Sequence, residues 1–117
     1  MSAAYFITGT DTDVGKTTIA AGLLHAARQA GKSTAAGKPV ASGCQLTPKG
    51  LRNADALELM AQSSIVLPYE QVNPFAFEPA IAPHLAAREA GVALTVQGLL
   101  APMRHVLAQR ADFTLIE

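Results

Sequence analysis

The sequence predicts an α/β fold in which helices cover a doubly wound, mostly parallel sheet. Residues 5–8 (YFIT) have the β-branched and aromatic bias of a buried strand. Residues 19–27 place apolar side chains at helical spacing, and the glycine-bounded loop GTDTDVGKT at residues 9–17 joins the two segments. Strand, loop and helix in this order are typical of the P-loop nucleotide-binding fold.

The loop has the residue types that bind nucleotide phosphates. Backbone N–H groups of the loop and of the first helical turn converge on phosphate oxygens in such folds, and the helix dipole favours negative charge there. In this pattern Lys16 reaches the terminal phosphates and the Thr17 hydroxyl contacts Mg²⁺. Thr10 stands where the usual pattern has its first glycine, with Gly9 one residue earlier. The alternative is an ordinary strand-to-helix turn, but the flanking strand and helix favour phosphate binding.

Composition favours one domain that acts on small molecules or on protein. Nine basic and nine acidic residues among 117 give zero net charge, which argues against a broad electrostatic surface for nucleic acid or an anionic membrane. Charged residues make up 15% of the chain, against about 25% in typical domains, while 50% are hydrophobic. We therefore expect other protein to cover part of the surface, through an oligomer or through a missing part of the chain.

Targeting and metal-binding signals do not accompany this composition. No stretch approaches the roughly 20 apolar residues of a membrane span, and the N-terminus lacks a secretory leader, so we expect a cytoplasmic protein. The single cysteine, Cys44, cannot form an intramolecular disulfide and is interpreted as an inert small residue. His25, His84 and His105 lack the paired spacing of metal ligands and are interpreted as packing or surface residues.

The first part of the chain predicts two strands joined by a crossover helix. The helix is expected from about Lys16 to Gly31, where a glycine gives a C-terminal stop. The second strand, residues 33–40, should end at Pro39. Because proline disfavours helical geometry in the preceding residue, Lys38 is held extended at the carboxyl end of this strand, where open α/β sheets bind ligands.

The rest of the chain predicts a loop, three helices and a last strand. Residues 41–50 are rich in turn formers and predict a loop over the same edge of the sheet. A helix capped by Asn53 follows, with Asp55 in its first turn, and four prolines predict irregular or extended backbone over residues 66–83. The remaining elements are a short helix ending at Gly91, a helix over about residues 96–111 with a kink or late start near Pro102, and a strand at residues 113–117.

Three charged residues lie where a site is expected, and each also has an ordinary explanation. Lys38 can be a solvated lysine at the end of a strand. Asp55 can be an acidic residue that stabilises a helix N-terminus. Glu117 ends an apolar strand, as does a carboxylate that holds Mg²⁺ directly or through water, but it is also the last residue of the sequence.

Several segments together resemble one family, the ATP-dependent dethiobiotin synthetases of biotin biosynthesis. The segments are residues 5–17 with their displaced first glycine, GKPVASG at 37–43, GLRNADAL at 50–57, VNPFAF at 72–77, EP at 78–79 and APH at 82–84. They cover nearly the whole chain. P-loop ATPases of the partitioning type share the loop but not the GKPVASG block, so this block separates the two families.

The resemblance implies a doubly wound P-loop fold and an ATP- and Mg²⁺-dependent ligase that acts as a homodimer. Its substrates would be 7,8-diaminopelargonate and CO₂ or bicarbonate. In that family CO₂ forms a carbamate on one amine, ATP phosphorylates the carbamate, and the second amine closes the ureido ring of dethiobiotin with loss of phosphate.

The resemblance also implies roles for individual residues of this sequence. Lys38 would be the catalytic lysine and Ser42 would contact the substrate. Mg²⁺ would bind among Thr17, Asp55 and Glu117. The nucleotide-binding positions would be Asp13, Val14, Gly15, Lys16, Thr17, Thr18, Asp55 and Glu117.

The family continues past the point at which this sequence stops, so we expect residues 1–117 to form a single P-loop nucleotide-binding domain truncated at its C-terminus. Two other functions stay open. One is a P-loop switch ATPase of the partitioning or maturation type, although such proteins usually carry an additional lysine early in the loop, which residues 10–12 lack. The other is an inactive nucleotide-binding fragment. Diamine-dependent phosphate release would separate the three functions.

Overall fold

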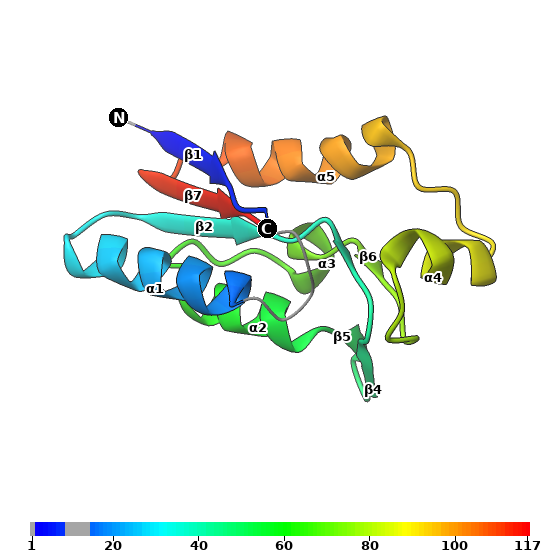
Figure 1. Cartoon of the computed structure of the whole chain (residues 1–117). Coiled ribbons are helices and arrows are strands. Elements are labelled where there is room, and N and C mark those ends of the chain that lie inside the picture. The colour runs from blue at the N-terminus through cyan, green and yellow to red at the C-terminus, as the bar shows by residue number, and fades with distance from the viewer. Residues whose placement is uncertain (1, 9–14) are drawn as a thin grey trace.

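The computed structural model describes residues 2–8 and 15–117 of the chain. Its centre is a parallel sheet in the order β1-β7-β2, made of Ala3–Phe6, Phe113–Ile116 and Thr34–Gly37. The last strand in the sequence, β7, therefore lies between β1 and β2, as Figure 1 shows. Because all three strands run the same way, their carboxyl ends meet at one edge of the sheet.

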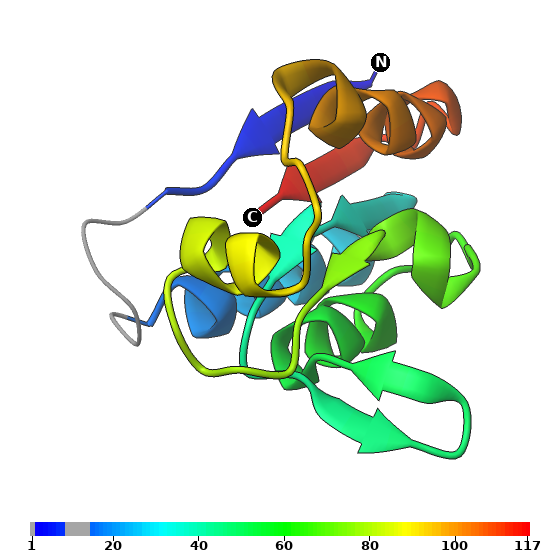
Figure 2. The ribbon, with the colours of Figure 1, turned by 90° about the vertical axis from the view of Figure 1, so that its right-hand side faces the viewer.

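Helices cover both faces of this sheet, as an α/β fold requires. Helices α1 (Lys16–Gln29) and α2 (Ala54–Ala61) lie on one face, while α5 (Val96–Ala108) and the one-turn α3 (Tyr69–Val72) lie on the other. Figure 2 shows the sheet between α5 above it and the pair α1 and α2 below it. The predicted α/β class with a parallel sheet is confirmed.

The core has two halves because neighbouring residues of a strand point to opposite faces. On β2, Ala36 packs toward α1 and α2 whereas Ala35 packs toward α5, and on β7 Leu115 and Ile116 divide in the same way. The half under α1 and α2 consists of Ala20, Leu24, Ala36, Leu59 and Leu115. The half under α5 consists of Ala35, Met103, Val106, Ala111 and Ile116.

Gly37 lets α5 approach the end of β2 closely. A Cβ atom at this position would lie 2.6 Å from the Met103 sulfur and 3.1 Å from Cδ1 of Ile116. Since the contact with Met103 is shorter than carbon and sulfur tolerate, a larger residue here would require the Met103 side chain to move. The glycine thereby allows close packing just before Lys38, at the edge where the three strands end.

Shorter elements surround the carboxyl edge of the sheet. A short parallel pair, a hairpin and a two-turn helix complete the fold: β3 (Val40–Ala41) with β6 (Phe75–Ala76), β4 (Gln45–Thr47) with β5 (Gly50–Arg52), and α4 (Pro83–Glu89). A separate apolar cluster of Phe77, Ala86 and Ala87 holds α4 against the segment that leaves the sheet. The hairpin projects away from the sheet (Figure 2).

Two sequence expectations for this region were wrong, the second only in part. Residues 41–50 were expected to be a loop but contain β3, β4 and the start of β5, because each strand is too short to show a periodic pattern. Residues 66–83 were expected to be irregular or extended; the two-residue strand β6 agrees with this expectation, whereas the helix α3 does not. Pro68 is the N-cap of α3, a position where proline does not interrupt a helix.

The first strand also differs from its expectation. It spans Ala3–Phe6 instead of residues 5–8, and it lies at the edge of the sheet. The side chains of Tyr5 and Phe6 are 53% and 66% exposed, so β1 is not the buried strand that its composition predicts. None of the described helices has the length and apolar character needed to span a membrane.

Candidate functional site

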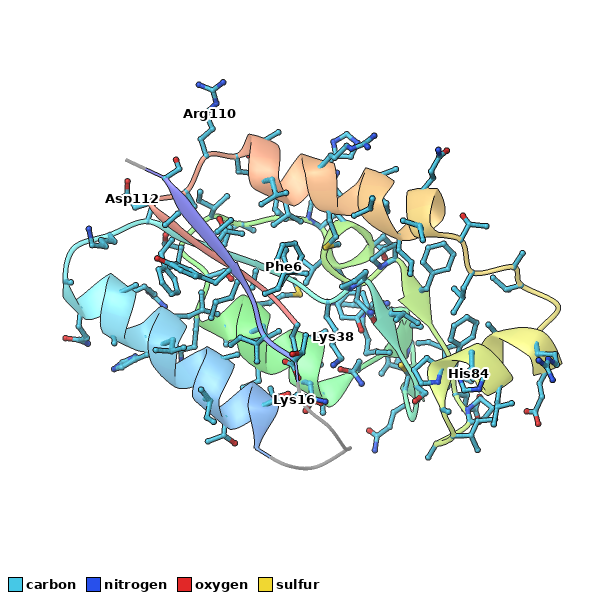
Figure 3. The ribbon with its side chains drawn as sticks, turned by 45° about the horizontal axis from the view of Figure 1, so that its top comes forward. Phe6, Lys16, Lys38, His84, Arg110 and Asp112 are labelled. Carbon is cyan, nitrogen blue, oxygen red and sulfur yellow. The ribbon has the colours of Figure 1, made fainter. Side chains whose placement is uncertain are left out.

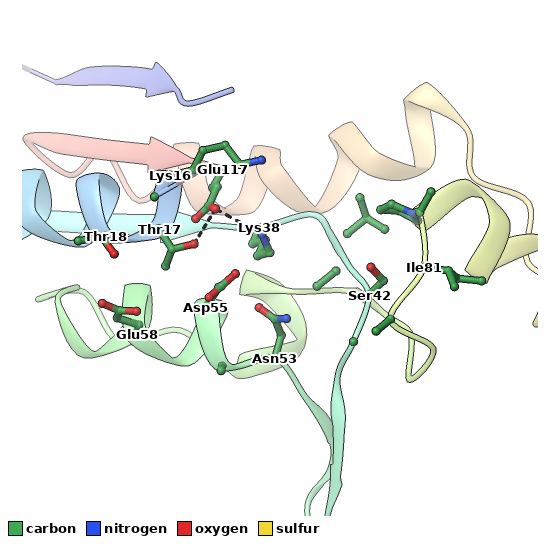
Figure 4. Close-up of a pocket in the computed structure, with 18 residues that line it drawn as sticks. Lys16, Thr17, Thr18, Lys38, Ser42, Asn53, Asp55, Glu58, Ile81 and Glu117 are labelled. Atoms are coloured by element: carbon green, nitrogen blue, oxygen red, sulfur yellow. Dashed lines mark hydrogen bonds and ion pairs between the residues drawn. The ribbon is translucent and has the colours of Figure 1, made fainter. Parts of the chain in front are cut away.

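A cleft of about 860 Å³ opens at the carboxyl edge of the sheet. The start of α1, the end of β2 with the segment after it, the start of α2, residues 80–83 and Glu117 form its walls (Figure 4). Strand ends are the usual place for ligands in open α/β sheets. A separate hollow of about 440 Å³ between α1 and α2 is lined by His25, Arg28, Gln29 and Gln62 and lies outside this cleft.

Strand register brings Lys38 and Glu117 together in the cleft. Gly37 of β2 pairs with Ile116 of β7, so the residues that follow them leave adjacent strands side by side. The backbone N–H of Glu117 donates to the Gly37 carbonyl at 2.9 Å. Lys38 Nζ lies 3.5 Å from Oε1 of Glu117, and the two side chains are 14% and 3% exposed. The pair is therefore an ion pair largely removed from water.

The Glu117 carboxylate also binds the start of α1. Its Oε1 accepts a hydrogen bond from the Thr17 hydroxyl at 2.7 Å, as drawn in Figure 4. Its Oε2 is buried and has no hydrogen-bond partner among the residues that the structure describes. A buried carboxylate oxygen without a partner is costly, so this atom is a ready acceptor for a cation or a donor brought by a ligand.

The residues around Oε2 fit a Mg²⁺ ion that is shared with a nucleotide. Mg²⁺ prefers oxygen ligands and usually binds one or two carboxylates together with water and phosphate oxygens. Glu117, the Thr17 hydroxyl and the half-buried Asp55 face one another across the cleft (Figure 4). Within the described ranges no group of three or more histidine, cysteine or acidic side chains is placed to hold a metal ion. The arrangement thus suits a metal completed by a ligand and not a site built from protein alone.

The start of α1 contributes one lysine and two threonine hydroxyls to the cleft. Gly15 precedes the helix with φ of 85°, a left-handed conformation that glycine adopts without strain. Lys16, Thr17 and Thr18 of the first turn all line the cleft. The side chains of Lys16 and Lys38 lie near each other at this edge, as Figure 3 shows.

The cleft unites most of the residues that the sequence selected. Gly15, Lys16, Thr17, Thr18, Lys38, Ser42, Asp55 and Glu117 all line it. Asp13 and Val14, also predicted to contact the nucleotide, lie outside the described residues. His84, which the sequence left out of the site, is on α4 away from Lys16 and Lys38 (Figure 3).

The chain is similar to proteins of known families. A family model described as an AAA domain, of the P-loop type, matches residues 3–117. The chain belongs to this family. Along the chain, the segment that the sequence predicts to bind phosphate lies between β1 and α1.

The most informative relatives have one name, "ATP-dependent dethiobiotin synthetase BioD". The chain is 71% identical to that of Pseudomonas paraeruginosa and 70% identical to that of Pseudomonas aeruginosa, in each case over 97% of this chain and 50% of the relative. It is 58% identical to that of Chromohalobacter salexigens over 97% of this chain and 48% of the relative. The resemblance seen in the sequence is thereby confirmed. The chain spans about half the length of these curated relatives.

The structure also places in the cleft several residues that the sequence analysis did not select. Asn53 lines it while capping α2, since its Oδ1 accepts the Ala56 N–H at 2.9 Å. Glu58 lines it one turn after Asp55, and this i, i+3 spacing on a predicted helix was the signal that could have found it. Residues 80–83 also line the cleft, and no local sequence pattern predicts that this segment lies there.

Cys44 is buried beside the cleft and does not line it. Its Sγ lies 3.6 Å from the Ala41 carbonyl oxygen. Burial raises the pKa of the Cys44 thiol above its usual range, which keeps the sulfur protonated and weakly nucleophilic at neutral pH. The environment is that of an inert core cysteine.

Proposed function

We propose that this chain is the nucleotide-binding part of an ATP-dependent dethiobiotin synthetase. The observation that carries the proposal is the Thr17–Glu117–Lys38 constellation beside an unpartnered carboxylate oxygen, in a chain up to 71% identical to enzymes with that name. The reaction would join 7,8-diaminopelargonate and CO₂ in the cytoplasm, where ATP is available.

Each group in the cleft has a role in this reaction. Lys16 and the first-turn amides of α1 would hold the ATP phosphates, together with Asp13, Val14, Gly15 and Thr18. Thr17, Asp55 and Glu117 would hold Mg²⁺, which offsets charge on the β- and γ-phosphates when bound. Ser42 would contact the diamine. The cleft walls exclude water from the ion pair at their centre, which strengthens every electrostatic contact made there.

The proposed reaction has three steps. One amine nitrogen adds to the carbon of CO₂ and loses a proton, which forms a carbamate. A carbamate oxygen then attacks the γ-phosphorus, and the bond to the ADP oxygen breaks. The second amine attacks the carbamate carbon and loses a proton, and phosphate leaves with the former carbamate oxygen as the ring closes. Lys38 would steady the negative charge of the carbamate and of the transferring phosphoryl group.

The position of Lys38 supports a catalytic role over its ordinary alternative. A solvated lysine at a strand end would be exposed, whereas the Lys38 side chain is 14% exposed and paired with Glu117. When a nucleotide and a metal occupy the cleft, Glu117 gains a cationic partner, and the ammonium group is left to pair with the substrate carbamate or phosphate. A switch ATPase gives this lysine no task.

A homodimer is part of the proposal. Large apolar side chains are exposed along β1 and α1, among them Phe6 and Ile19 at 66% and 59%. Apolar surface of this kind is usually covered by other protein. The family resemblance implies that the rest of a full-length enzyme and a second subunit would bury this apolar surface.

The test measures phosphate release by a protein of the full length of these relatives. Release should require both 7,8-diaminopelargonate and bicarbonate, and mass spectrometry should detect a product heavier than the diamine by one carbonyl group less two hydrogens. ATP hydrolysis that ignores the diamine would favour a switch ATPase. Binding of ATP without any hydrolysis would favour an inactive nucleotide-binding protein.

A further inference from the structure

A buried tyrosine hydroxyl bridges two segments that lead to the cleft. The Tyr69 oxygen accepts the backbone N–H of Asn53 at 2.6 Å and donates to Oδ1 of Asn73 at 2.8 Å. The residue is 8% exposed, and the Arg52 guanidinium carbon lies 4.2 Å from the centre of its ring. Burial raises the pKa of the Tyr69 hydroxyl, so the group stays protonated at neutral pH and can both donate and accept.

One end of this bridge holds the backbone of Lys38. The Asn73 side-chain amide donates to the Lys38 carbonyl at 2.7 Å, and the Lys38 N–H donates to the Val72 carbonyl at 2.8 Å. Asn73 is 2% exposed. Both backbone polar groups of Lys38 are therefore hydrogen-bonded to the end of α3. In the part of the chain that the structure describes, they make no bond to the neighbouring strand β7.

The other end holds the start of α2. Asn53 caps this helix, and its backbone N–H is the group bound by the Tyr69 oxygen. Asp55 lies in the first turn that this cap begins, on the wall of the cleft facing Thr17 (Figure 4). A path of hydrogen bonds thus runs from Lys38 through Asn73 and Tyr69 to the helix that carries Asp55.

We propose that Tyr69 is a positioning residue whose hydroxyl sets the separation between Lys38 and Asp55 across the cleft. The roles of those two side chains rest on the proposed function above, whereas the hydrogen bonds that connect them do not. A network of fully satisfied buried hydrogen bonds rigidifies what it connects. Phosphoryl transfer depends on such rigidity, because a misplacement of about 1 Å can slow an enzyme by about 10²-fold.

The substitution Tyr69→Phe removes the hydroxyl and leaves the ring, with its contact to Arg52, in place. Thr34→Val is a matched control at the opposite end of β2. The Thr34 hydroxyl is also buried, donates to the Gln62 carbonyl at 2.9 Å and accepts the Ser64 N–H at 2.8 Å. Each substitution therefore deletes one buried hydroxyl that donates one hydrogen bond and accepts one. Tyr69 bonds to the start of α2, which lines the cleft, whereas Thr34 joins the amino end of β2 to the carboxyl end of α2, away from the cleft.

Calorimetry of ATP binding at increasing Mg²⁺ is the first measurement, and it needs no diamine. We expect Tyr69→Phe to raise the Mg²⁺ concentration for half-maximal binding by about tenfold, the lower range for residues that orient metal ligands. Thr34→Val should leave this value unchanged although it lowers the unfolding midpoint in urea by a similar amount. An unchanged Mg²⁺ requirement in Tyr69→Phe, or an equal change in Thr34→Val, would overturn the proposal.

Turnover of the full-length protein is the second measurement. In Tyr69→Phe we expect kcat to fall by about 10-fold to 10²-fold while the KM for ATP changes little. Asn73→Ala cuts the same path one bond further on and should show the same pattern. If wild-type protein shows no diamine-dependent turnover, the ligase function fails, yet the Mg²⁺ measurement still decides the role of Tyr69. Failure of both variants to fold, with Thr34→Val folded, would assign Tyr69 to stability and also overturn the proposal.

Discussion

At the scale of residues, the site depends on one carboxylate that takes part in several interactions. Glu117 accepts from Thr17 and pairs with Lys38 through the same oxygen, which leaves its second oxygen for a ligand. The second acid, Asp55, is half-buried at the start of α2. It faces the Glu117 carboxylate from the other wall of the cleft. The two acids are therefore expected to act on one cation from two sides.

Asp55→Asn should weaken Mg²⁺ dependence without unfolding the protein. Asn53 keeps capping α2 in this variant, and the lost first-turn charge costs about 0.3–1 kcal/mol of stability. An amide is a poorer ligand for a hard cation, so the Mg²⁺ requirement of ATP binding should rise by about 10-fold to 100-fold. Glu89→Gln is the control, since it removes an acidic charge from an exposed side chain of α4 that does not line the cleft. Equal effects in both variants would return Asp55 to the role of a helix-terminus charge.

At the scale of elements, α5 ends with a residue in a conformation that suits glycine. Arg110 has φ of 51°, and its N–H donates to the Leu107 carbonyl at 3.1 Å. A left-handed conformation costs a non-glycine residue about 1–2 kcal/mol. Arg110→Gly should therefore stabilise the protein by about 1 kcal/mol in urea unfolding with an unchanged slope.

Gln109→Gly provides the comparison for Arg110→Gly. Gln109 has φ of −67°, where glycine gains nothing and raises the entropy of the unfolded chain. This variant should lose up to about 1 kcal/mol. Destabilisation by both glycines would show that the Arg110 side chain, and not its backbone, controls the end of α5.

A second element-scale feature joins the amino ends of β2 and β7. Asp112 Oδ2 accepts the Ser33 N–H at 2.9 Å, and Ser33 Oγ accepts the Asp112 N–H at 2.9 Å. These hydrogen bonds with Ser33 hold the pKa of Asp112 below its usual range. The folded state therefore binds the proton more weakly than the unfolded state.

Asp112→Asn should consequently have an effect on stability that depends on pH. The contribution of the carboxylate is fully present above the unfolded pKa of about 3.9 and is lost as pH falls through the lower folded value. The difference in unfolding free energy between wild type and Asp112→Asn should be largest near neutral pH and should shrink in acid. Urea unfolding from neutral pH to below the unfolded pKa measures this. A constant difference over that range would contradict the assignment.

The sequence was sufficient to place most of the site because its chemistry lies at strand ends. Lys38 precedes a proline at the end of one strand, and Glu117 ends another, so both positions could be predicted from local pattern. That the two side chains touch could not be predicted. Their contact requires β2 and β7 to be neighbours with Gly37 opposite Ile116, a pairing of positions 79 apart in the sequence.

The elements that sequence reasoning missed are short and held by distant partners. Helix α3 has four residues, too few for a helical pattern, and its Tyr69 acts through Asn53, which lies 16 positions earlier. The strands of the β4–β5 hairpin have three residues each, and the apolar side chain of Leu46 in β4 is largely exposed. By contrast, α1, α2 and β7 follow strong local signals and were predicted to within a few residues.

At the scale of the whole molecule, the parallel sheet gathers the ends of its strands around one cleft. The chain spans about half of each of its named relatives, and its edge strand β1 exposes two aromatic side chains. The central claim is that this cleft separates two tasks. In the proposed function, Lys16 and the start of α1 would bind the nucleotide, whereas Lys38 would act on the groups that react.

Substituting the two lysines in the full-length protein tests this claim most directly. Lys38→Ala should reduce kcat for diamine-dependent phosphate release by about 10²–10³-fold, the effect of losing one aimed electrostatic donor, while ATP affinity by calorimetry changes little. Lys16→Ala should instead abolish the stabilisation of about 2.7 kcal/mol that Mg·ATP gives at 100 times its Kd. Normal turnover in Lys38→Ala, or loss of ATP affinity equal to that of Lys16→Ala, would contradict the account.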